Sequence, residues 1–207
     1  MTDQPGPEET REATARPFSA VLLAGGRSRR MGRDKARLDC GGRTLLERQA
    51  ALLRALAPAE CFLAARTPDA YPDLGLPVLA DAFPGQGPLA GIERALAVAR
   101  QPLVLVLAVD LPRLTASRLR QLLAAGGEAT GVVPRVAGRF EPLAAVYPKS
   151  AHALAAARLD AGQNRARAFA VACVERGWAR PLDLPPEAAN EFANWNTPGD
   201  AARAPVA

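Results

Sequence analysis

Hydrophobic and polar positions along the chain form short apolar runs that alternate with stretches of helical periodicity. The apolar runs end at glycine, proline or aspartate, and their length is typical of buried strands. In the other stretches apolar residues recur at helical spacing, and Thr44 and Thr115 precede two of them as N-caps. We expect strands at residues 18–24, 61–65, 77–80, 103–109, 130–136 and 142–147, and helices at residues 45–57, 89–100, 116–125 and from 150 onwards.

This alternation predicts an α/β fold with a mainly parallel sheet, right-handed βαβ units and helices on both faces. Such sheets bind ligands at the carboxyl ends of their strands, so the loops that begin at Gly25 and Asp110 are where a site is expected. We expect one domain over residues 18–207, preceded by a charged, proline-bearing, disordered tail over residues 1–17.

Composition narrows the class of protein. The chain has 207 residues, of which 49% are hydrophobic and 23% charged, and it lacks an apolar run long enough to cross a bilayer. The net charge of +5 comes almost entirely from dispersed arginines, which favours anionic small substrates over a nucleic acid. Three cysteines without a CxxC pair argue against a disulfide framework, and a cytoplasmic location without membrane attachment is expected.

The segment Leu23 to Lys35 reads L-A-G-G-R-S-R-R-M-G-R-D-K and directly follows the first predicted strand. Glycines let backbone N–H groups approach an anion closely, and a lysine adds a point charge, so the segment suits a triphosphate. It is neither a P-loop nor a dinucleotide fingerprint, since both of those spacings are absent. The alternative is a glycine-rich strand exit with solvated arginines.

Asp110 follows the strongest predicted strand, L-V-L-V-L-A-V. An ionised carboxylate at that point must face a cleft or a cation, because burying it unpaired is costly. Mg²⁺ prefers such oxygen ligands and bridges them to phosphates. The alternative is an aspartate that caps a helix or forms a turn before Pro112.

Two further segments could contact ligands. In D-A-F-P-G-Q-G-P-L-A-G-I, Asp81 lies beside glycines 85, 87 and 91, and a carboxylate next to free N–H groups could match guanine; the alternative is a proline–glycine connection. In E-F-A-N-W-N-T-P-G-D, Asn194 and Asn196 precede Thr197 and Pro198, which predict the start of a last helix, and both asparagines could also face the site. His152 is expected on a helix surface, and Trp195 is expected to be a packing residue.

Taken together and in this order, the four segments resemble the molybdenum cofactor guanylyltransferase (MobA) family over about residues 18–200. The resemblance implies a three-layer, Rossmann-like nucleotidyltransferase fold with GTP as donor, Mg²⁺ as cofactor and molybdopterin-bound molybdenum cofactor as acceptor. It also implies that the product is the guanine dinucleotide form of the cofactor, with pyrophosphate released. Transient contact with cofactor-synthesis proteins or molybdoenzymes would follow.

Carried over residue by residue, the resemblance implies a GTP site that includes two catalytic residues, Lys35 for the phosphates and Asp110 for both GTP and Mg²⁺. The other GTP-binding positions are Leu23, Ala24, Gly25, Gly26, Asp81 and Gly87. Asn194 and Asn196 match positions near the pterin. The chain departs from the family pattern at Ala64, where members often carry asparagine, and at Val109.

Other functions remain open at this point. Molybdopterin cytidylyltransferases and sugar-phosphate nucleotidyltransferases share the expected fold, although their glycine segments differ from Ala24-Gly25-Gly26. A non-catalytic, nucleotide-binding adaptor is a third possibility, and the presence of both Lys35 and Asp110 argues against it.

Overall fold

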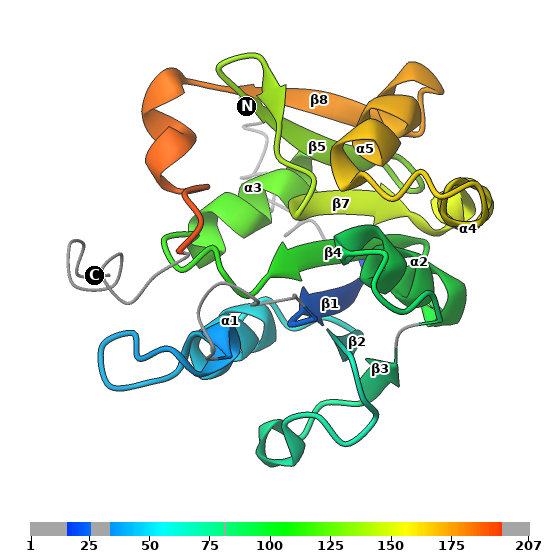
Figure 1. Ribbon diagram of the computed structural model, residues 1–207. Coiled ribbons are helices and arrows are strands. Elements are labelled where there is room, and N and C mark those ends of the chain that lie inside the picture. Colours follow the sequence, from blue (N-terminus) through cyan, green and yellow to red (C-terminus); the bar gives the residue numbers. More distant parts are fainter. Residues whose placement is uncertain (1–15, 26–33, 81, 196–207) are drawn as a thin grey trace, which may run out of the picture.

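The computed structural model describes residues 16–25, 34–80 and 82–195, and within them the chain forms one mixed sheet with helices on both faces (Figure 1). The strand order is β3-β2-β1-β4-β7-β5-β6, and β8 pairs with β5 outside this path. The strands are β1 (Ser19–Leu23), β2 (Glu60–Ala65), β3 (Val78–Ala80), β4 (Leu103–Ala108), β5 (Gly131–Val136), β6 (Arg139–Phe140), β7 (Ala144–Pro148) and β8 (Ala179–Leu184).

The first four strands form the parallel part of the sheet. Every residue of β1 and β4 is buried, which explains why both read as continuous apolar runs. Leu23 lies opposite Ala64 of β2 and Ala108 of β4, so these three strands end at the same level. Their loops therefore begin side by side at one edge of the sheet.

The other strands make the sheet mixed. β7 runs antiparallel to both β4 and β5, whereas β8 runs parallel to β5. The connection from β6 to β7 is only residues 141–143, and so short a link leaves no room for a crossover helix. β8 was not predicted, because most of its residues are at least partly exposed and it lacks an apolar run.

The helices cover two faces of this sheet and give three layers. Helices α1 (Leu45–Arg54) and α3 (Ala116–Ala125) pack on one face, whereas α2 (Pro88–Val98), α4 (His152–Asp160) and α5 (Ala166–Glu175) pack on the other (Figure 1). Successive residues of β1 point to opposite cores, with Leu22 on the first face and Leu23 on the second. The predicted α/β architecture is confirmed.

Short helices and caps complete the fold. Four 3₁₀ helices are described: η1 (Lys35–Arg37), η2 (Pro72–Leu74), η3 (Lys149–Ala151) and η4 (Pro186–Asn190). Thr44 caps α1 in a reciprocal arrangement with Glu47, and Thr115 caps α3, as predicted. None of the described helices is long and apolar enough to span a membrane. Residues 1–15 of the predicted tail lie outside the described residues. Arg16, which belongs to the same predicted tail, is described, and its guanidinium donates to the carbonyl of Gly126 at 3.0 Å.

Candidate active site

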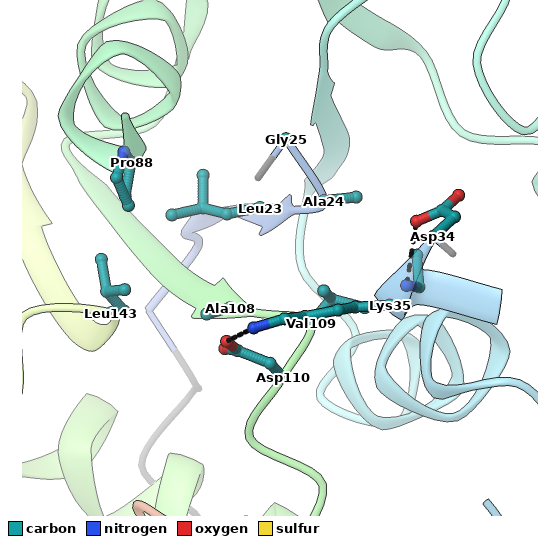
Figure 2. A pocket seen from close by; sticks show the side chains of 11 residues that line it. Leu23, Ala24, Gly25, Asp34, Lys35, Pro88, Ala108, Val109, Asp110 and Leu143 are labelled. Atoms are coloured by element: carbon teal, nitrogen blue, oxygen red, sulfur yellow. Dashed lines mark hydrogen bonds and ion pairs between the residues drawn. The ribbon is translucent and has the colours of Figure 1, made fainter. Parts of the chain in front are cut away.

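The carboxyl ends of β1 and β4 open into a pocket of about 120 Å³ (Figure 2). Backbone hydrogen bonds hold its floor together: Ala24 donates to Ala64 at 2.9 Å, and Val109 donates to Leu23 at 3.1 Å. The lining residues come from the ends of β1 and β4, from η1, from the start of α2 and from the position directly before β7. They are Leu23, Ala24, Gly25, Asp34, Lys35, Ala36, Pro88, Ala108, Val109, Asp110 and Leu143.

Lys35 and Asp110 face each other across this pocket. The Lys35 ammonium lies 3.9 Å from Asp110 Oδ2, and the side chain of Lys35 points toward this carboxylate (Figure 2). Their side chains are 28% and 20% exposed, respectively. Burial raises the pKa of Asp110 above its ordinary value, and the positive charge of Lys35 offsets this only in part. The carboxylate is therefore partly desolvated and would be stabilised by a further cation.

The segment that carries Asp110 is held from two sides. Helix α1 supplies Gln49, whose Nε2 donates to the carbonyl of Leu111 at 2.6 Å, and Arg48, whose Nε donates to the carbonyl of Pro112 at 3.0 Å. From the C-terminal side, the backbone N–H of Trp195 donates to the carbonyl of Asp110 at 2.9 Å. The next helix, α3, is capped by Thr115 rather than by Asp110, so the alternative of a helix-capping aspartate is not supported. Asp110 does lie in a turn before Pro112, as the other alternative had it.

The N-terminus of α2 borders the pocket on a second side. Gly87 precedes the helix with a φ of 76°, a positive value that glycine adopts readily, and Pro88 occupies the first turn. At Gly91 an added Cβ would lie 2.9 Å from Leu23 Cδ2 and 3.1 Å from Ala64 Cβ. A side chain there would meet β1 and β2, so Gly91 lets α2 pack closely against these two strands.

A small cleft continues from the pocket toward β2. It is lined by Ala64, Ala65, Gly87 and Gly91 and shares Leu23, Gly25 and Pro88 with the larger pocket. The departure from the family pattern at Ala64 falls in this cleft, where the small side chain leaves room beside the helix terminus. An asparagine contact from that position is absent in this chain.

Five of the residues that the sequence suggested line the same pocket: Leu23, Ala24, Gly25, Lys35 and Asp110. Gly87 lines the adjoining cleft, and Asn194 is exposed beside the buried Trp195. Gly26, Asp81 and Asn196 lie outside the described residues.

Sequence reasoning did not anticipate Asp34, Pro88, Leu143 or Gln49. Asp34 had a signal, since it directly precedes Lys35 in the glycine-rich segment. Leu143 had none, because only the antiparallel pairing of β7 with β4 brings it to the pocket, where its carbonyl accepts from the Ala108 N–H at 2.8 Å.

Other titratable side chains lie away from the pocket. His152, at the start of α4, is half-buried, and its Nε2 lies 2.7 Å from Oε1 of the buried Glu93 on α2. The part of the chain that the structure describes contains no group of three or more His, Cys, Asp or Glu residues that could hold a metal ion.

Comparison with known proteins decides the family. The model of the MobA-like NTP transferase domain matches residues 20–177, a span that contains both Lys35 and Asp110. The chain belongs to the MobA-like NTP transferase family. The predicted family resemblance is confirmed.

Individual members of the MobA-like family agree in sequence and fold. The chain is 40% identical over 194 residues to a protein of Opitutus terrae named "Probable molybdenum cofactor guanylyltransferase", covering 92% of this chain and 96% of that one. It is 37% identical over 188 residues to the molybdenum cofactor guanylyltransferase of Cereibacter sphaeroides, covering 89% and 93%. The solved structure of molybdopterin-guanine dinucleotide biosynthesis protein A from Archaeoglobus fulgidus superposes with a TM-score of 0.68 at 25% identity, covering 90% and 96%.

Proposed function

We propose that this chain transfers GMP from GTP to molybdopterin-bound molybdenum cofactor, forming the guanine dinucleotide cofactor and pyrophosphate. The observation that carries the proposal is the convergence of Lys35 and Asp110 on one pocket at the carboxyl ends of β1 and β4. Relatives that align over about nine-tenths of the chain bear the guanylyltransferase name, which supports the same activity here.

The reaction is an in-line substitution at phosphorus. An oxygen of the acceptor phosphate forms a bond to the α-phosphorus of GTP, and the bond from that phosphorus to the oxygen bridging to the β-phosphorus breaks. Pyrophosphate leaves with the electron pair. Since the attacking phosphate is already ionised at neutral pH, the protein needs no nucleophile or general base of its own.

Two anions must meet in this reaction, so the main task of the protein is to neutralise charge and to align the groups. In the proposal, the Lys35 ammonium holds the phosphates of GTP, and the positive end of α2 lies beside them. Backbone groups at Leu23, Ala24 and Gly25 bound the same pocket, and in the proposal Gly26 continues that contact.

The carboxylate of Asp110 fits the proposed Mg²⁺. It is partly desolvated at the end of a buried strand, and Mg²⁺ is commonly held by one or two carboxylates together with water and substrate phosphates. When bound, the metal supplies positive charge to the phosphate oxygens and fixes their orientation. Asp110 and Lys35, whose charged groups lie 3.9 Å apart, would then both act on the same triphosphate.

The remaining contacts follow from the layout of the site. In the proposal, Asp81 and Gly87 contact the nucleoside, since the cleft lined by Gly87 lies on the β2 side of the pocket. In the proposal, Asn194 and Asn196 contact the acceptor, because the backbone N–H of Trp195 between them is hydrogen-bonded to the carbonyl of Asp110. We also propose that the protein acts in the cytoplasm, in transient contact with cofactor-synthesis proteins or molybdoenzymes. Its three cysteines are free thiols, which is typical of proteins in a reducing compartment: Cys40, Cys61 and Cys173.

Pyrophosphate release tests the proposal. The full chain is incubated with Mg²⁺, a molybdopterin acceptor and GTP, CTP or ATP in separate reactions. Pyrophosphate formed with GTP alone, and only when the acceptor is present, is the expected result. Release with CTP instead would assign a cytidylyltransferase, and binding of GTP without release would assign a non-catalytic adaptor.

A further inference from the structure

Tyr71 lies in the connection between β2 and β3 and adopts an unusual backbone conformation. Its φ of 55° and ψ of 56° place it in the left-handed region, which is sterically unfavourable for a residue with a Cβ. Nothing about tyrosine favours this conformation, so surrounding contacts must hold it there. The contacts of the Tyr71 side chain therefore contribute to holding this conformation.

The hydroxyl of Tyr71 reaches the segment that carries Lys35. It donates to Oδ2 of Asp34 at 2.6 Å, across 37 residues of sequence. Arg37 closes the cluster from the other side, because its Nε lies 3.8 Å from Asp34 Oδ2 and its guanidinium lies 5.7 Å from the centre of the Tyr71 ring. Burial and the neighbouring Asp34 raise the pKa of Tyr71 above its ordinary value, so the hydroxyl remains a donor at neutral pH.

Asp34 in turn determines how Lys35 enters the pocket. Its Oδ1 accepts the backbone N–H of Ala36 at 3.1 Å and so caps η1, the single turn formed by Lys35–Arg37. A three-residue 3₁₀ turn has little stability of its own, so its direction depends on contacts with the rest of the protein. Both Asp34 and Lys35 line the pocket, and Lys35 points from this turn toward Asp110 (Figure 2).

We propose that Tyr71 is a positioning residue for Lys35, holding Asp34 and the η1 turn so that the ammonium group meets the phosphates of GTP. The inference rests on the proposed function. It assigns Tyr71 no contact with the substrate: the hydroxyl acts through Asp34, and Asp34 acts through the turn that carries Lys35.

If the same hydrogen bond only stabilised the fold, its removal would lower the melting temperature and leave nucleotide kinetics unchanged. The side chain of Asp34 is 41% exposed, so water can replace the tyrosine hydroxyl when it is removed. Loss of a solvent-accessible hydrogen bond has little effect on folding stability. A positioning role therefore predicts a change in nucleotide handling without a change in melting temperature.

The first experiment compares Tyr71→Phe with Asp73→Asn, a matched change at an exposed position on the adjoining η2 helix. Tyr71→Phe is expected to lower kcat/KM for GTP roughly tenfold, since small displacements of positioned groups can cost up to about 10²-fold. Its melting temperature should equal that of the wild type, and Asp73→Asn should match the wild type in both measurements. Unchanged kinetics in a folded Tyr71→Phe protein would overturn the inference.

A double-mutant cycle tests whether Tyr71 acts through Lys35. GTP affinity in the presence of Mg²⁺ is measured by titration calorimetry, which does not depend on turnover. Tyr71→Phe should weaken binding in the wild type and have less than about a twofold effect in a Lys35→Met background. Equal effects in both backgrounds would show that Tyr71 works independently of Lys35 and would refute the proposal.

Asp34→Ala provides a second route to the same contact. It removes the carboxylate that accepts the tyrosine hydroxyl and caps η1, whereas the amide of an asparagine could donate to the hydroxyl oxygen and restore a hydrogen bond. This variant should weaken GTP binding at least as much as Tyr71→Phe, and the two changes together should do no more than Asp34→Ala alone. Additive losses would contradict the proposal. Failure of the proposed function is distinguishable, because it would appear as absent GMP transfer in the wild-type protein.

Discussion

The backbone N–H of Trp195 donates a hydrogen bond of 2.9 Å to the carbonyl of Asp110, joining residues 85 positions apart in the sequence. Nearby, the guanidinium of Arg118 on α3 binds both carboxylate oxygens of Glu191 at 2.8 Å. The C-terminal segment is therefore attached to the same loop that carries the proposed metal ligand. The hydrogen bond therefore connects the proposed GTP side of the site, at Asp110, with the proposed acceptor side, at Asn194.

Truncation of Trp195 should affect both stability and activity. The residue is only 3% exposed, so Trp195→Ala should lower the free energy of unfolding by roughly 3–5 kcal/mol, as large-to-small core changes do. Urea unfolding measures this loss, and Trp178→Ala, at a half-buried position, serves as the control with a smaller loss. Trp195→Phe should retain more activity than Trp195→Ala, and equal activities would argue against support of Asp110 by this residue.

Asp110→Asn should separate activity from stability. Loss of the charged ligand should reduce turnover by roughly 10²–10³-fold, the range seen when single electrostatic groups are removed. Because burial raises the pKa of Asp110 in the folded state, its ionised form costs stability at neutral pH, and that cost grows as pH rises through the folded-state pKa. The metal-free variant should therefore melt at the wild-type temperature or slightly above it. Near-wild-type turnover would refute the assignment of Asp110.

Selection of the base should depend on Asp81 and on the segment from residue 84 to residue 91. Adenine reverses the hydrogen-bond pattern at position six and lacks the 2-amino group, so it would leave polar groups in the site unpaired. Sites of this kind can reject analogues by factors of up to about 10⁴. Asp81→Ala should weaken GTP use far more than it weakens folding. Use of CTP or ATP as readily as GTP by the wild type would exclude guanine specificity and leave only nucleotidyl transfer.

Removal of the N-terminal tail should leave the domain intact. Deletion of residues 1–15 is expected to change neither melting temperature nor activity, because a charged, proline-bearing segment buries little apolar surface. Deletion through residue 17 also removes the Arg16 hydrogen bond to Gly126, worth about 0.5–1.5 kcal/mol at most. A drop of several degrees with the shorter deletion would show that the tail packs on the domain.

Glu60 should make stability depend on pH at the amino end of β2. Burial alone would raise its pKa, but hydrogen bonds from the Ser19 hydroxyl and from the Arg100 backbone and guanidinium lower it from 4.5 to about 2. A carboxyl whose folded-state pKa is depressed contributes stability above its unfolded pKa and loses it as pH falls through the folded one. Melting temperature should therefore fall between pH 4.5 and pH 2 in the wild type.

Glu60→Gln should flatten that dependence and lower the melting temperature at pH 7, whereas Glu128→Gln at an exposed position should change neither. The measurement is thermal unfolding at a series of pH values. An unchanged profile in Glu60→Gln would show that this carboxylate does not contribute.

The sequence by itself was enough to determine the family, the α/β class and most of the elements. Buried parallel strands such as β4 must be apolar along their whole length, and helices such as α1 carry their own cap residues, so both leave a local pattern. The glycine segment before Lys35 and the aspartate after β4 were likewise visible, since both stand where strands end.

Tertiary structure alone decided which residues surround those groups. Leu143 reaches the pocket through an antiparallel pairing, Trp195 through a backbone hydrogen bond, and Tyr71 through a left-handed turn that brings its hydroxyl to Asp34. None of these contacts leaves a local pattern, because each depends on two segments far apart in the chain. Periodicity reports how a residue relates to its own helix or strand, whereas a site is built from the ends of several elements that only folding brings together.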